Sequence, residues 1–99
     1  MNKQEAISSQ IKEIMGYYNF ERALKHRNEY LREEDMETVS IGEYVQDAVE
    51  LMEELNSHSM IGSGFWTAML DEGEENGQKW LKVSLFHGES TIQDGVDYE

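Results

Sequence analysis

Three stretches in the first half of the chain carry apolar residues at the spacing of one helix face. In the first stretch, Asn2 stands where an N-cap belongs and Glu5 follows three positions later, which is the order of a capping box. The second helix is expected to begin at Asn19, and Gly16 either ends the first helix or only weakens it. The apolar positions of these two helices are Ile7, Ile11, Ile14, Met15 and Tyr18, followed by Phe20, Ala23, Leu24 and Leu31.

The third stretch carries the most start signals. Ser40 is a good N-cap, Glu43 occupies the reciprocal capping-box position, and Val39 and Tyr44 stand where a hydrophobic staple would. The polar residues 56–59 are expected to end this helix. Its apolar stripe consists of Ile41, Tyr44, Val45, Ala48, Leu51, Met52 and Leu55.

After residues 62–64, Gly-Ser-Gly, which we interpret as a flexible joint, the pattern changes to that of strands. Residues 65–70 are short and apolar, residues 71–77 carry turn chemistry that ends in Asn-Gly, and residues 79–86 alternate. This order predicts a β-hairpin. An isolated hairpin is marginally stable in water, so it must pack on the helices.

The last residues have two interpretations. Thr91, Ile92 and Val96 allow a short third strand; otherwise residues 89–99 form an acidic tail. With 99 residues the chain has the length of a single domain. The predicted fold class is α+β, with three helices followed by a β-hairpin.

The formal charge of −13 is distributed very unevenly along the chain. Residues 1–32 have a net charge of +2, and residues 33–99 have −15. Residues 33–78 contain 13 carboxylates and no Lys or Arg. Mixed signs would relieve the repulsion between like charges. We therefore expect this 46-residue segment to serve a cationic partner.

Four carboxylates of the third helix recur at i, i+4, i+7 and i+11, which places them on one helix face, expected opposite the apolar stripe. Neighbours in this row lie roughly 4.5–6 Å apart along the axis, which is somewhat sparser than the roughly 3.4 Å spacing of charges on one DNA strand. Two further clusters of acidic residues lie in residues 33–37 and 71–75. An ordinary solvated helix can also show an acidic face. The candidate partner-binding residues are Glu43, Asp47, Glu50 and Glu54 of the helix and Asp71, Glu72, Glu74 and Glu75 of the hairpin tip.

This layout resembles the small phage-encoded and mobile-element inhibitors of bacterial defence nucleases, the DNA-mimicking anti-CRISPR and anti-restriction proteins. The resemblance covers roughly residues 33–75 and lies in length, charge, the lack of Cys and Pro, and the acidic helix with its acidic hairpin tip. These proteins share no common motif, so no residue role is carried over. The resemblance implies a non-enzymatic inhibitor that blocks the nucleic-acid groove of a basic protein, such as a CRISPR effector, in the bacterial cytoplasm without binding nucleic acid directly.

Two other binding functions stay open from the sequence. An immunity protein or antitoxin that caps a basic toxin would show the same acidity but depend more on aromatic anchors. An acidic adaptor domain would use its charge only for solubility. Tyr17, Trp66 and Trp80 are either interface anchors or core residues.

Catalysis and membrane insertion are not expected. Without Cys there is no disulfide, thiolate nucleophile or Cys-ligated metal. His26, His58 and His87 lack metal-binding spacing, so we expect no catalytic residue, metal or cofactor. No apolar run is long enough to span a membrane, and residues 1–5 lack the apolar core of a signal peptide, so we expect a cytoplasmic protein.

Overall fold

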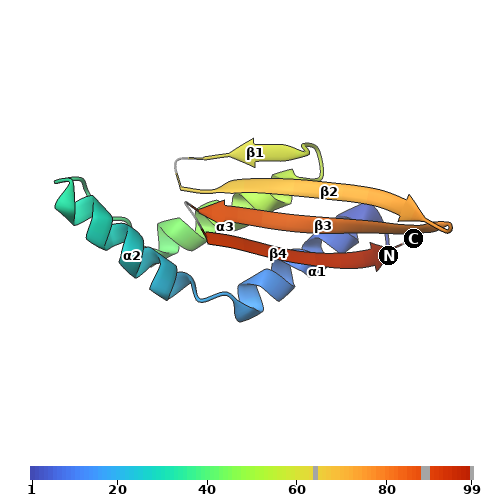
Figure 1. Ribbon diagram of the computed structural model, residues 1–99, viewed down its shortest axis with the longest axis horizontal. Helices are drawn as coiled ribbons and strands as arrows, with labels where there is room; N and C mark the ends of the chain where they lie inside the picture. The colour runs from blue at the N-terminus through green and yellow to red at the C-terminus, as the bar shows by residue number, and fades with distance from the viewer. Residues whose placement is uncertain (64, 88–89, 99) are drawn as a thin grey trace.

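The computed structural model describes residues 1–63, 65–87 and 90–98. Three helices precede four strands in the chain, which confirms the predicted α+β class (Figure 1). The helices are α1 (Lys3–Tyr17), α2 (Phe20–Glu33) and α3 (Ile41–Glu54). The strands are β1 (Met60–Gly62), β2 (Thr67–Glu75), β3 (Gln78–His87) and β4 (Ser90–Tyr98).

The three helices begin at the predicted N-cap residues. The Asn2 side chain accepts a hydrogen bond from the Glu5 backbone N–H at 2.8 Å, and the Glu5 carboxylate accepts one from the Asn2 backbone at 3.1 Å. Asn19 and Ser40 each accept the backbone N–H three residues ahead, at 3.0 and 3.2 Å. These bonds satisfy donors that the first helical turn leaves unpaired, so local sequence determines where each helix starts.

The strands form one antiparallel sheet in the order β1-β2-β3-β4. Between β2 and β3 the turn is only Asn76 and Gly77, whose φ angles are 52° and 81°. Positive φ at both positions is the type I′ geometry that suits a two-residue hairpin, and Asn-Gly adopts it readily. The prediction that residues 71–77 all form the turn is therefore wrong. Residues 71–75 pair without interruption with 78–82, so the polar residues extend the strand.

Both edges of the sheet differ from the simple hairpin. β1 was not predicted, because a three-residue strand is too short to show a period; it pairs through Met60–Met69 and Ile61–Ala68. Ser63 accepts the N–H groups of Phe65 and Trp66 at 3.1 Å each, whereas residue 64, on which the expected flexible joint also falls, lies outside the described residues. At the other edge, residues 90–98 pair along β3, which makes them a strand and not a tail.

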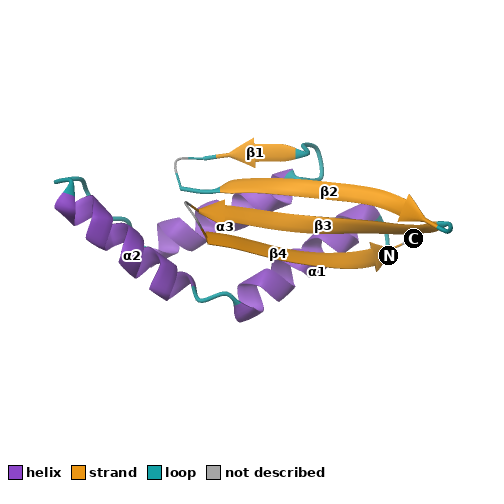
Figure 2. Cartoon of the chain, in the orientation of Figure 1, coloured by secondary structure: helices purple, strands orange, loops and turns teal. Residues whose placement is uncertain are grey.

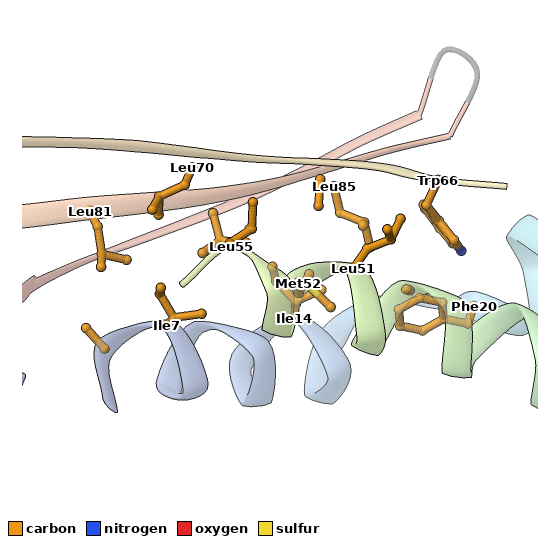
Figure 3. Packing of buried hydrophobic residues seen from close by; sticks show 14 of the residues in the cluster. Ile7, Ile14, Phe20, Leu51, Met52, Leu55, Trp66, Leu70, Leu81 and Leu85 are labelled. Atoms are coloured by element: carbon orange, nitrogen blue, oxygen red, sulfur yellow. The ribbon is translucent and has the colours of Figure 1, made fainter. Parts of the chain in front are cut away.

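Helices α1 and α3 pack against one face of the sheet, and Figures 1 and 2 show both helices behind the strands. In Figure 3, Leu70, Leu81 and Leu85 of the sheet point toward Ile7 and Leu55 of the helices, and these residues form part of a single buried core. Among the described residues, no helix covers the opposite face, which we call the open face. Alternation of side chains along the strands assigns to it Met60 and Gly62 of β1, Thr67, Met69, Asp71, Gly73 and Glu75 of β2, Gln78, Trp80, Lys82, Ser84 and Phe86 of β3, and Gly95 and Asp97 of β4.

The molecule is elongated, with principal extents of 52 × 22 × 20 Å. Helix α2 extends beyond the sheet at one end, and the β2–β3 turn forms the other end (Figure 1). Asn28 of α2 binds both backbone groups of Val39, accepting its N–H at 2.9 Å and donating to its carbonyl at 3.0 Å. These two bonds hold α2 against the segment that leads into α3.

Candidate functional site

The four carboxylates Glu43, Asp47, Glu50 and Glu54 form one line along α3, which we call the acidic row. All but Asp47 are exposed; Asp47 is half-buried and accepts a hydrogen bond from the Ser63 hydroxyl. The row was expected opposite the apolar stripe, but this bond places it on the flank of α3 beside the β1–β2 turn. At about 100° per residue, the centre of the row lies about 130° from the centre of the stripe, short of the roughly 180° of a directly opposite face. The helix geometry alone therefore predicts this flank position.

Asp47 has a structural role within the row. Ser63, to which it is bonded, also accepts the backbone N–H groups of Phe65 and Trp66, so Asp47 fixes the turn that carries Trp66 into the core. Glu50 accepts a hydrogen bond from Gln46 at 3.0 Å and stays exposed. The row therefore offers three freely exposed carboxylates to a partner.

The hairpin carboxylates do not form one cluster. Because side chains alternate along a strand, Asp71 and Glu75 lie on the open face, whereas Glu72 and Glu74 lie on the helix-covered side. Glu72 is also paired with Lys3 of α1, with 2.9 Å between the Lys3 Nζ and a Glu72 carboxylate oxygen. The structure thus separates residues that the sequence placed together at a tip.

The three acidic segments follow one another along the long axis of the molecule. Residues 33–37 follow the outer end of α2, the acidic row lies in the middle, and residues 71–75 lead to the β2–β3 turn at the far end (Figure 1). An extent of 52 Å corresponds to about 15 base pairs of B-DNA at about 3.4 Å per step. The negative charge is therefore spread over a length comparable to a short duplex.

The protein's own cations neutralise little of this charge. Within the described residues, Lys3–Glu72 is the only ion pair between a carboxylate and a Lys or Arg. Among the described residues, a further contact joins His26 Nδ1 and a Glu29 carboxylate oxygen at 3.9 Å. The uncompensated carboxylates repel one another, and a cationic partner would relieve this repulsion.

The three aromatic residues left open by the sequence have different positions. Trp66 belongs to the core: its side chain is 1% exposed and its indole N–H donates to the Tyr44 carbonyl at 3.1 Å. Tyr17 is 56% exposed on α1. Trp80 is half-buried on the open face. Only Tyr17 and Trp80 are therefore placed to contact a partner.

Sequence reasoning did not single out two residues beside Trp80. Gly73 lies opposite Trp80 on β2, and Asp97 lies opposite it on β4. Asp97 was missed because residues 89–99 had two interpretations, and only strand pairing aligns it with β3. The alternation through Ile92 and Val96 was the available signal.

His87 is half-buried at the end of β3. The Tyr44 hydroxyl and His87 Nδ1 are joined by a hydrogen bond, and the Trp66 ring centroid lies 5.1 Å from that of the imidazole. Burial raises the pKa of Tyr44 well above its ordinary value, so this hydroxyl stays protonated. Burial, and secondly the charge of Arg27, lower the pKa of His87. The pair is thus a neutral hydrogen bond between α3 and the sheet.

A groove of about 1000 Å³ lies between α1 and the far end of α3, with Ile7, Ile11, Lys12, Glu53 and Glu54 among its lining residues. Tyr44 stands in the first turn of α3, and neither Tyr44 nor His87 lines this groove. The hydrogen bond between them joins α3 to the sheet.

The His87 environment predicts a pH dependence of stability. The pKa of His87 is lowered in the folded protein, so the unfolded chain binds the proton more readily. The contribution of His87 to the free energy of unfolding is fully present above the ordinary histidine pKa of about 6.5. It decreases as the pH falls from there toward the lower pKa that His87 has in the folded protein. Denaturant unfolding between about pH 7.5 and 5.5, above the ordinary carboxylate range, should show this decrease. The decrease should shrink in His87→Gln and persist in His26→Gln; an unchanged slope in His87→Gln would contradict the assignment.

Comparison with known proteins adds no functional information: no family model matches the sequence, and no curated protein and no solved structure matches it. Across the described part of the chain, no three His, Asp or Glu side chains are grouped as metal ligands. Nor is any described helix both long enough and apolar enough to cross a bilayer.

Proposed function

We propose that this protein is a non-enzymatic inhibitor whose exposed carboxylates occupy the basic nucleic-acid groove of a bacterial defence nuclease, such as a CRISPR effector. One observation carries the proposal: in a chain of charge −13, the described residues form a single ion pair between a carboxylate and a Lys or Arg. Interspersed charges would lower the self-repulsion without loss of solubility. Because the carboxylates of this surface repel one another without such relief, we infer that their negative charge has a function.

The acidic row suits this function. Its exposed members Glu43, Glu50 and Glu54 are separated by about 10 Å and about 6 Å along the helix axis, at about 1.5 Å per residue. A groove that binds nucleic acid presents Lys and Arg along a backbone path, and an Arg guanidinium binds a carboxylate as well as a phosphate, through two parallel hydrogen bonds. The helix holds its carboxylates on a rigid scaffold, which limits the ordering cost on binding.

Salt dependence and competition by DNA test the proposal. The tagged protein is used to capture proteins from a bacterial lysate, and the captured nuclease is then assayed for DNA cleavage with and without the inhibitor. We expect capture to weaken strongly between about 0.05 M and about 0.5 M salt, because screening lengths shorten over this range. Duplex DNA should displace the nuclease from the tagged protein at a far lower concentration than polyglutamate does, when both are counted as the concentration of negative charges. Capture that resists both salt and duplex DNA would refute the mimicry.

That last outcome would favour the second candidate, an immunity protein or antitoxin that caps a basic toxin. The observation in its favour is Trp80, an aromatic side chain on a sheet face that no described helix covers. Tryptophan is enriched among residues that dominate protein interfaces. In that case binding should depend on Trp80 more than on the acidic row.

A further inference from the structure

The indole of Trp80 packs against Gly73 of β2. A Cβ atom placed on Gly73 would stand 2.8 Å from Trp80 Cζ2 and 2.9 Å from both Cε2 and Nε1, distances at which real Cβ atoms essentially never occur. Glycine at position 73 is therefore what allows the ring to rest on the sheet. Because no described helix covers this face, the other side of the ring is directed outward.

Three carboxylates share the open face with Trp80 at neighbouring positions of the register. Asp97 is directly opposite Trp80 on β4, and Asp71 and Glu75 lie two residues to either side of Gly73 on β2. Side chains directly opposite in an antiparallel pair are about 5 Å apart at Cβ, and residues i and i+2 of a strand are about 7 Å apart. None of the ion pairs found among the described residues involves these three groups.

The nearest cation of the chain does not occupy this place. Lys82 follows Trp80 by two residues on the same face, opposite Asp71, yet it forms no ion pair within 4.0 Å in the described part of the chain. The one cation–π contact there is between Arg27 and Tyr30. Among the described residues, none of these cation contacts involves the indole of Trp80.

An aromatic ring with carboxylates at neighbouring positions favours the binding of a planar cation. An indole face attracts cations through its quadrupole, and tryptophan does so best. Arginine can stack its flat guanidinium on the ring while its N–H groups bind a neighbouring carboxylate in a fork, which the compact ammonium of lysine cannot do. Phosphates of a nucleic acid, or a second copy of a chain with charge −13, would be repelled by the same carboxylates.

We infer that Trp80, with Asp71, Glu75 and Asp97, forms a binding site for an arginine side chain of the basic partner. This inference rests on the proposed function for the partner's basic character, but it names a separate contact on the opposite side of the sheet from the helices. Asp71 and Glu75, which the sequence assigned to a hairpin tip, act here together with an aromatic platform.

The probe is the blocked tripeptide acetyl-Gly-Arg-Gly-amide, with its Lys and Gln counterparts as comparisons. The indole N–H resonances of Trp80 and the buried Trp66 are followed by heteronuclear NMR, so that Trp66 serves as an internal control. We expect the Arg peptide to shift the Trp80 resonance saturably, the Lys peptide to shift it less, and the Gln peptide and the Trp66 resonance to show no response. A Trp80 resonance that ignores the Arg peptide, or responds equally to the Gln peptide, would overturn the inference.

Variants separate this site from the acidic row. Trp80→Ala should lower the affinity for the Arg peptide by about two- to five-fold, the factor expected for an exposed cation–π contact. Because this variant lacks the Trp80 resonance, the affinity is measured from other resonances of β2 and β3. Phe86→Ala, at the carboxylate-free end of the same face, should leave the affinity unchanged. The triple change Asp71→Asn, Glu75→Gln, Asp97→Asn should reduce the Trp80 shift, whereas Glu43→Gln, Glu50→Gln, Glu54→Gln should not. An equal reduction of the Trp80 shift in both triple variants would show a general charge effect and would refute the arginine site. A failure of duplex DNA to compete in the capture experiment would contradict the proposed function but not the arginine site.

Discussion

Replacing Trp66 with alanine is expected to lower the free energy of unfolding by about 3–5 kcal/mol, the range for removing a large buried aromatic side chain. Such a loss is a large fraction of the about 5–15 kcal/mol that holds a typical domain folded. Trp66 is 1% exposed and its ring centroid lies 4.8 Å from that of Tyr44 and 5.8 Å from that of Phe20. The cavity would open where α2, α3 and the start of β2 meet.

A hydrogen bond adds to this packing. The Trp66 indole N–H donates to the Tyr44 carbonyl at 3.1 Å. Trp66→Phe keeps most of the ring volume but removes this donor, and we expect a smaller loss of about 1–3 kcal/mol, from the lost hydrogen bond and the reduced packing. If the alanine variant does not fold, the phenylalanine variant carries the test.

The matched control is Trp80→Ala, because Trp80 is the other tryptophan of the chain and lies half-buried on the open face. Its removal should cost about 1 kcal/mol, as for most substitutions outside a core. Urea unfolding followed by far-ultraviolet circular dichroism measures all three variants, since fluorescence would change with the number of tryptophans. Equal losses for Trp66→Ala and Trp80→Ala would contradict the assignment of Trp66 to the core.

Reversing the exposed charges of the acidic row is expected to abolish partner binding while leaving the fold intact. The triple variant Glu43→Lys, Glu50→Lys, Glu54→Lys changes the formal charge from −13 to −7. Binding to the captured nuclease should fall by about 100-fold or more, because attraction becomes repulsion at three positions and like charges brought together cost several kcal/mol. The free energy of unfolding should change by only about 1 kcal/mol, since all three side chains are exposed.

A control variant with the same charge change separates the row from the net charge. Glu13→Lys, Glu21→Lys, Glu29→Lys alters three exposed carboxylates on α1 and α2. We expect a loss of only a few-fold, mainly in the association rate, because long-range steering responds to net charge whereas close pairing responds to position. Equal losses in both triple variants, measured by binding kinetics at a fixed salt concentration, would contradict a specific role for the row.

Features that depend on neighbours in the chain were predictable from the sequence. Asn2, Asn19 and Ser40 start the three helices as expected, because an N-cap bond joins residues three positions apart. The Asn-Gly turn was recognised for the same reason, although the polar run before it was taken for part of the turn. The acidic row and the absence of cations in residues 33–78 are also properties of the chain itself.

Features that join distant segments were decided by the tertiary structure. The three-residue strand β1 acquires its order from pairing with β2, and the hairpin carboxylates separate onto two faces because only one face packs against helices. Likewise, sequence could not distinguish Trp66 from Trp80, since both are aromatic residues in strand-like segments, until α3 covered one of them. The chain thus determined where its helices begin and how its charge is distributed, because these depend on residues a few positions apart. Which charges stay exposed, and beside which aromatic ring, depended on contacts between segments tens of residues apart, which local patterns do not encode.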